Sequence, residues 1–151
     1  MPRPDRPLAG PAPSALTPTL LQAYRETDYT VFAQPAFVLR VDKYCAQLAA
    51  YCTQHGLNAA CWLTAWNPRS ELLGTAENQA RQQALQAQLQ QAGWHWLPAT
   101  AAHPRNGWPP EPGCFIAGMD TDTASDWGRR HGQNAVICCG PDAVPRLVLL
   151  R

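Results

Sequence analysis

The sequence predicts an α/β protein, a single domain in which a mixed, mostly central-parallel β-sheet is flanked by three to four helices. Predicted strands alternate with predicted helices along the chain, which favours parallel pairing. The segments 59–65 and 133–139 are apolar on both faces, as expected of strands covered on both sides. At 151 residues, 46% of them hydrophobic, the chain has the size and composition of one domain. An α+β two-layer sandwich is the alternative architecture.

The N-terminal segment is expected to lie outside this domain. Residues 1–15 are rich in proline and carry no apolar periodicity, so we predict a disordered tail before a domain at 16–151. This segment also lacks the apolar stretch of an export signal, which predicts a cytoplasmic protein. Nowhere does an apolar run reach the length of about 18 residues that crosses a bilayer, so no membrane association is expected.

The first half of the chain is predicted to hold two helices, an antiparallel strand pair and a central strand. Thr17 before Pro18 is typical of a helix start, and Gly56 is typical of a helix end. The predicted elements are a short helix after Thr17, strands 28–33 and 36–41 around Gln34-Pro35, a helix capped by Asp42, and strand 59–65.

The second half begins with a helix rich in Gln and Ala, two good helix formers. Thr75 is its predicted N-cap and Gly93 its predicted end. The predicted elements are helix 76–92, strand 94–97, an irregular segment over 98–112 with five prolines, strand 114–119, helix 122–131, and strands 133–139 and 146–150.

Charge and motifs exclude several function classes. Eleven Arg and one Lys against eleven acids give a net charge of +1, too small for a nucleic-acid footprint. The six cysteines show no CxxC and no zinc spacing, which predicts reduced structural thiols and no metal site. Strand alternation should place Cys138 and Cys139 on opposite faces. Glycine-rich nucleotide loops are missing as well, so no cofactor is predicted.

One polar constellation stands out at an edge of the predicted sheet. Leu85 and Leu89 form the inward stripe of helix 76–92, and extending it backwards reaches Arg81 and Asn78. The ends and beginnings of the neighbouring strands meet the start of this helix, where ligands bind in open α/β sheets. The candidate ligand-binding residues are Thr64, Trp66, Asn67, Asn78, Arg81, Glu111, Gln133 and Asn134.

Two functions and one structural role are compatible with this constellation. In the first, Arg81 and the helix start bind a small anionic molecule, with turnover an option and Glu111 the only candidate general base. In the second, the protein is an interaction module that uses loop 98–112, with Trp108 as its anchor. In the third, the polar groups only satisfy loop backbone. A monomer is favoured, and no reaction is assigned.

Four segments of the chain carry a resemblance to a known family. They are the YRETDY run at 24–29, the TAWNP run at 64–68, the ENxxR pattern at 77–81 and the GQNA run at 132–135. Over roughly residues 20–140 the chain resembles the DUF3293 family of small bacterial proteins of unknown function. The resemblance implies a bacterial cytosolic protein and brings no activity with it.

Overall fold

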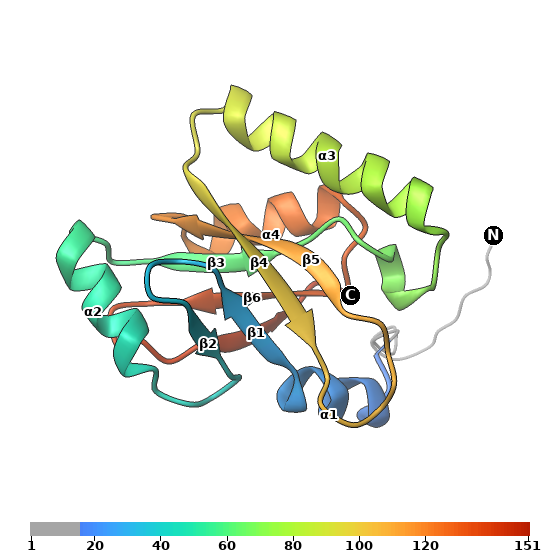
Figure 1. Ribbon diagram of the computed structural model, residues 1–151, viewed down its shortest axis with the longest axis horizontal. Helices are drawn as coiled ribbons and strands as arrows, with labels where there is room; N and C mark the ends of the chain where they lie inside the picture. The colour runs from blue at the N-terminus through green and yellow to red at the C-terminus, as the bar shows by residue number, and fades with distance from the viewer. Residues whose placement is uncertain (1–15) are drawn as a thin grey trace, which may run out of the picture.

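The computed structural model describes residues 16–151, and the predicted tail lies outside them. These residues form one seven-stranded sheet and four α-helices (Figure 1). The strands are β1 (Asp28–Val31), β2 (Phe37–Leu39), β3 (Ala60–Leu63), β4 (Trp96–Ala102), β5 (Glu111–Ala117), β6 (Ala135–Cys139) and β7 (Arg146–Leu149). The helices are α1 (Pro18–Glu26), α2 (Ala46–His55), α3 (Thr75–Gln91) and α4 (Thr121–Arg130), with a 3-10 turn η1 (Pro68–Ser70).

The prediction of a mostly parallel sheet is wrong. The strand order is β2-β1-β4-β5-β3-β6-β7, and every neighbouring pair is antiparallel. An α+β architecture, the alternative, agrees broadly with this arrangement. The predicted antiparallel pair around Gln34-Pro35 is confirmed by the pairing of β1 with β2.

Strands joined by helices do run in the same direction, but they are not neighbours. Strand β5 is antiparallel to both β4 and β3 and lies between them, so the crossover through α3 skips one strand. Strand β3 lies in the same way between β5 and β6, which α4 connects. This interleaving is the split βαβ arrangement of ferredoxin-like folds. It still brings the end of β3 and the starts of β5 and β6 to one rim.

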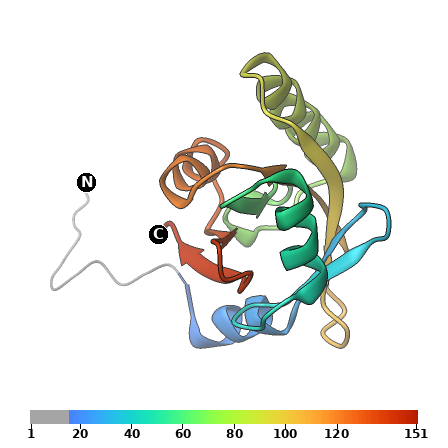
Figure 2. The same ribbon diagram turned by 90° about the vertical axis from the view of Figure 1, so that its left-hand side faces the viewer.

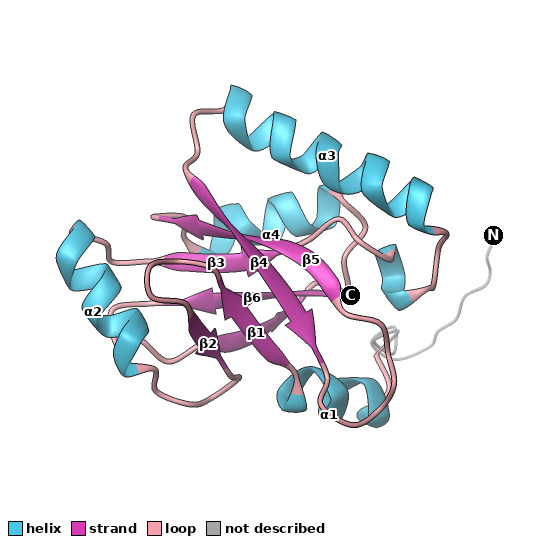
Figure 3. Cartoon of the chain, in the orientation of Figure 1, coloured by secondary structure: helices cyan, strands magenta, loops and turns pink. Residues whose placement is uncertain are grey.

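Helices cover the sheet from two sides (Figure 3). Leu48 of α2 belongs to one apolar cluster, whereas Leu85 of α3 and Trp127 of α4 belong to the other. The strands contribute alternate residues to the two clusters. Cys139 lies in the first and Cys138 in the second, which confirms their predicted placement on opposite faces.

The sheet is curled, and backbone hydrogen bonds join the segments at its two edges. After β2, the Asp42 N–H donates to the Pro145 carbonyl at 2.7 Å, just before β7. The Cys45 N–H donates to the Ala143 carbonyl at 3.0 Å. Helix α1 lies at one end of the curl, beside β7 (Figure 2). The result is a half-barrel whose inner face is filled by α2 at one end and faces α1 at the other.

The irregular segment predicted for 98–112 is shorter than expected, because β4 continues through Pro98 and β5 includes Pro112. A strand residue points its N–H and C=O to the same side. The Pro98 carbonyl accepts from Phe32, just past the end of β1, and the Pro112 carbonyl accepts from Thr64, just past the end of β3. Each missing proline N–H therefore faces a position where the neighbouring strand has ended, which a sheet tolerates.

Helix starts follow the predictions only in part. Thr17 caps α1 as predicted, because its side chain accepts from the Leu20 N–H. Asp42 does not cap α2; the chain takes a positive φ there, and Cys45 is the N-cap. For α3 the N-cap is Gly74 rather than Thr75. Within residues 16–151, the helices all fall short of the length and apolar character that a membrane span requires.

The six cysteines are free thiols, as predicted. Burial raises the pKa of Cys138 to about 11 and that of Cys114 to about 12. Because the thiolate is the reactive form, we expect both residues to resist iodoacetamide in the native protein at mildly alkaline pH. Peptide mass spectrometry of native and guanidine-unfolded samples measures this. Equal alkylation of the two residues in both samples would contradict the burial described here.

Candidate functional site

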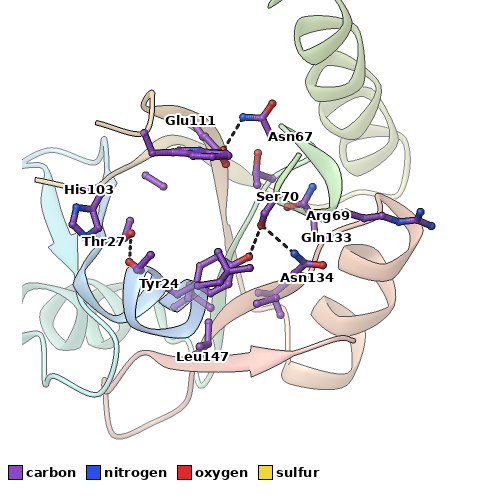
Figure 4. Close-up of a pocket in the computed structure, with 18 of the residues that line it drawn as sticks. Tyr24, Thr27, Asn67, Arg69, Ser70, His103, Glu111, Gln133, Asn134 and Leu147 are labelled. Carbon is purple, nitrogen blue, oxygen red and sulfur yellow. Dashed lines mark hydrogen bonds between the residues drawn. The ribbon is translucent and has the colours of Figure 1, made fainter. Parts of the chain in front are cut away.

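A cavity of about 630 Å³ lies between α1 and the inner face of the sheet (Figure 4). Its deeper wall is apolar and aromatic, with Tyr29, Trp62, Ile137 and Leu147 among the lining residues. Polar side chains from five parts of the chain line the remainder: Tyr24, Ser70, His103, Glu111 and Asn134. Its volume falls in the range typical of small-molecule sites.

The loop after β3 forms one wall of this cavity in an unfavourable backbone conformation. Asn67, Arg69 and Ser70 have φ values of 46°, 60° and 57°. Residues with a Cβ rarely adopt this left-handed region, and each instance costs about 1–3 kcal/mol when the surroundings enforce it. The Arg69 N–H donates to the Gly132 carbonyl at 2.8 Å, which ties the loop to the turn before β6. Such conformations cluster at functional sites.

A reciprocal pair of asparagines holds the start of this loop. Asn78 Oδ1 accepts from the Asn67 N–H at 2.8 Å, and Asn78 Nδ2 donates to Asn67 Oδ1 at 2.8 Å. The same Asn67 oxygen accepts from the Leu73 N–H at 2.9 Å. Asn67 Nδ2 is thereby directed towards Glu111 Oε2, 2.9 Å away. Asn78, at 2% exposure, therefore positions Asn67 and lies one layer behind the cavity wall.

Glu111 presents a carboxylate with one occupied and one unoccupied oxygen. Its Oε2 accepts from Asn67 Nδ2 and, at 2.7 Å, from Trp108 Nε1. No described residue donates to Oε1, and none forms an ion pair with this carboxylate. Burial raises the pKa of Glu111, and the two hydrogen bonds oppose that rise. The free oxygen can accept a hydrogen bond from a bound molecule, and the ionised carboxylate can form an ion pair with a cationic one.

A second polar group lies at the opposite side of the cavity mouth (Figure 4). The Tyr24 hydroxyl lies 2.9 Å from Ser70 Oγ, and Asn134 Nδ2 donates to the same Oγ at 3.0 Å. Burial raises the pKa of Tyr24, so its hydroxyl remains protonated at neutral pH. These contacts connect α1, the strained loop and the start of β6 across the cavity.

The loop between β4 and β5 is pinned at its base. His103 Nδ1 accepts from the Arg105 and Asn106 N–H groups, both at 3.0 Å, and His103 Nε2 lies 2.9 Å from Glu26 Oε1. The loop thus attaches to the end of α1. Trp108 is 36% exposed and reaches back to Glu111 from the loop tip.

Residues 63–136 match a family model described as "Protein of unknown function (DUF3293)". By this match, the chain belongs to the DUF3293 family. Comparison with curated proteins and with solved structures finds no match. The DUF3293 match runs from the last residue of β3 into β6, so it covers nearly the whole split βαβ unit. It includes the strained loop, Asn78 and Glu111 and ends before β7; α1 and Tyr24 lie outside it.

Five of the eight predicted site residues line the cavity of this DUF3293 protein: Thr64, Asn67, Glu111, Gln133 and Asn134. Trp66 takes part through its backbone, because its carbonyl accepts from Gln133 Nε2 at 3.3 Å and its N–H donates to Thr64 Oγ1. Asn78 supports the wall from behind. Strand ends and strand starts therefore meet near the start of α3, as the sequence analysis expected, although the strands are paired differently.

Arg81 is not part of the cluster, and the expectation that it faces the sheet is wrong. Its side chain is 45% exposed and pairs with Glu77 at 3.3 Å along the helix surface. The buried stripe of α3 is Asn78, Gln82, Leu85 and Leu89, so the inward position is 82 rather than 81. Gln82 is a polar residue that the sequence analysis missed, and its Oε1 accepts from the Ala65 N–H at 2.9 Å.

We expect Arg81→Ala to leave stability almost unchanged, within about 0.5 kcal/mol, because an exposed pair of this spacing contributes little. Urea unfolding of both proteins measures the difference. A loss of several kcal/mol would show that Arg81 has a buried partner and would contradict the placement described here.

Other cavity residues could not be found from the sequence analysis. Tyr24 belongs to a segment quoted for the family resemblance, but nothing in its spacing places α1 against the rim. Ser70 follows Asn67-Pro68 in a loop whose left-handed conformation has no glycine to indicate it. His103 lies in the predicted irregular segment, from which it could reach a site, but nothing in the sequence pairs it with another group of the cavity.

Proposed function

We propose that this DUF3293 protein binds a small organic molecule in the cavity between α1 and the sheet, with Glu111 as its anchor. The observation that carries the proposal is the carboxylate itself, which is partly buried, has no ion-pair partner among the described residues and keeps Oε1 free. Buried charges are ordinarily paired, so a group of this kind facing a cavity favours a ligand over scaffold. The strained loop on the adjacent wall supports the same conclusion.

The proposal revises the ligand class expected from the sequence. An anion was expected because Arg81 was placed in the cleft, whereas Arg81 pairs with Glu77 on the surface. At the cavity, by contrast, Glu111 offers a partly buried carboxylate with a free oxygen. A neutral or cationic ligand with a hydrogen-bond donor therefore suits the cavity better. The expectation of a cytoplasmic, monomeric bacterial protein is kept as part of the proposal.

The alternative, an interaction module built on loop 98–112, has less support. Residues 98–102 and 111–112 belong to strands, which leaves a loop of 103–110. Its proposed anchor, Trp108, directs its indole N–H to Glu111 at the cavity mouth rather than being free for a partner.

If Glu111 is kept for ligand binding, its ionised carboxylate should lower the free energy of unfolding of the protein without ligand. The folded-state pKa of Glu111 is raised, so its contribution to stability is fully present below its unfolded pKa and is lost as pH rises through the folded pKa. We expect Glu111→Gln, which can still accept from Asn67 and Trp108, to be more stable than wild type at neutral pH. Urea unfolding at neutral pH and near pH 4, close to the ordinary pKa of a glutamate, should show the difference shrinking in acid. A variant less stable than wild type at neutral pH would assign Glu111 to the scaffold.

Binding itself is tested by filling the cavity. Ala101 and Ala102 are neighbours on β4 that point to opposite faces, and Ala101 alone of the two lines the cavity. Fragments are screened by ligand-observed NMR against wild type, Ala101→Phe and the matched control Ala102→Phe. We expect fragments that bind wild type and Ala102→Phe but not Ala101→Phe. No fragment binding, or binding unaffected by Ala101→Phe, would overturn the proposal.

A further inference from the structure

We infer that the ligand of this cavity is a small organic cation, an ammonium group on an aromatic or aliphatic body, held by the Glu111 carboxylate. The inference rests on the proposed function and narrows it to one charge class. Three features carry it: the state of the carboxylate, the placement of the nearby basic groups, and the rings of the cavity wall.

The two hydrogen bonds on Glu111 orient the carboxylate without neutralising it. Both donors, Asn67 Nδ2 and Trp108 Nε1, are uncharged, and both act on Oε2. They favour the ionised form against the burial that raises its pKa. The free Oε1 then carries negative charge at the cavity with no donor from the described residues. A cation supplies the missing charge together with a charge-assisted hydrogen bond, which is stronger than a neutral one.

The basic groups that line the cavity do not pair with Glu111. His103 Nε2 faces Glu26, and Arg151 Nη1 donates to Asn134 Oδ1 at 3.4 Å, in the polar group on the other side of the cavity mouth. The Arg69 side chain extends away from the cavity (Figure 4). None of these groups contributes to the pKa shift of Glu111, whose causes are burial and the two neutral donors. The carboxylate therefore has no internal counter-ion to displace.

The remaining wall suits the body of an organic cation rather than a hydrated ion. Tyr24, Tyr29, Trp62 and Trp108 all line the cavity, and the Tyr29 and Trp62 rings meet edge to face with centroids 4.9 Å apart. Aromatic faces attract cations and also cover apolar groups. Leu20, Ile137 and Leu147 add aliphatic surface. Aromatic rings around one carboxylate form a recognition site that favours an ammonium group over a neutral or anionic one.

Matched probes test the charge class directly. Two bodies, 2-phenylethyl and cyclohexylmethyl, are each offered with an ammonium, a hydroxyl and a carboxylate head, and binding to the full-length protein is followed by NMR titration. We expect at least one amine to bind about tenfold more tightly than its alcohol, with the carboxylate weakest. Glu111→Gln should remove this preference and leave the alcohol affinity unchanged. Glu77→Gln, which removes an exposed carboxylate outside the cavity, should retain it.

The outcomes separate this inference from the proposed function. An alcohol or carboxylate that binds as tightly as the matching amine, or an amine preference that persists in Glu111→Gln, overturns the cationic ligand while cavity binding stands. If neither amine binds but the fragment screen gives hits that Ala101→Phe abolishes, the cationic ligand is again overturned and cavity binding stands. If no probe binds in the titrations and the screen gives no hits, both the cationic ligand and cavity binding are overturned.

Discussion

Replacing Asn78 by alanine should lower the free energy of unfolding by about 2–4 kcal/mol. The buried Asn67 N–H and the part-buried Leu73 carbonyl lose their side-chain partner, and Asn67 Oδ1 loses one of its two donors. Asn78 is 2% exposed and serves the Asn67 N–H, Asn67 Oδ1 and the Leu73 carbonyl. A leucine cannot replace it, since its side chain offers neither donor nor acceptor. The loop with left-handed Asn67 and Ser70 would lose its attachment to α3, so ligand binding should fail as well.

The control for this prediction lies one residue further along α3. Gln79 is exposed, and Gln79→Ala should be neutral or slightly stabilising because alanine is the better helix former. Urea unfolding of the two variants gives the comparison. An Asn78→Ala protein within about 1 kcal/mol of wild type would mean that water replaces the asparagine and that the loop does not depend on it.

Gly113→Ala should be destabilising by about 3 kcal/mol, although it adds a single methyl group. A Cβ at this position on β5 would lie 2.3 Å from Trp62 Cζ2 and 2.6 Å from Cε2. The indole cannot easily retreat, because it is 5% exposed and packs against Tyr29. Its Nε1 already lacks an acceptor among the described residues. The added methyl must displace the indole, and that ring forms part of the cavity wall.

Gly140→Ala provides the matched control for Gly113→Ala. No heavy atom lies within 4 Å of a Cβ built at Gly140, and its φ lies outside the positive range that disfavours a side chain. Thermal unfolding and near-ultraviolet circular dichroism of both variants measure the loss of stability and the movement of the indole. Equal melting temperatures for the two variants would contradict the close packing of Trp62 on β5.

Much of the secondary structure could be predicted from local signals, whereas the pairing of strands could not. Thr17-Pro18 and Gly56 fix helix ends through short-range hydrogen bonds that any fold would use. Two strands joined by a helix can be direct neighbours in a sheet, or a later strand can lie between them. No residue pattern in 59–65 or 94–97 predicts that 111–117 will lie between these two strands. An interleaved antiparallel sheet and a parallel one therefore give the same order of helices and strands.

Part of the candidate site could be predicted, because it depends only on which ends of the strands meet at one edge of the sheet. The end of β3 and the starts of β5 and β6 meet at one rim in either topology, which is why Asn67, Glu111 and Asn134 come together. Helix phase was less predictable, because a stripe extended back from Leu85 reaches position 81 or 82 according to the choice of a three- or four-residue step. The structure takes the three-residue step to Gln82 and the four-residue step to Asn78.

The strand order has a consequence for the chain during its synthesis. Strand β3 pairs with β5 and β6, both of which follow it, and β5 begins at Glu111, 48 positions after Leu63. While this stretch leaves the ribosome, β1, β2 and β4 can pair, but β3 has no strand partner, and the backbone of its four apolar residues stays unpaired until β5 arrives. Unpaired apolar strands are prone to aggregate in partly folded chains. Nascent chains arrested before Glu111 should therefore bind holdase chaperones through 60–63, and chains that extend beyond Cys139 should be released.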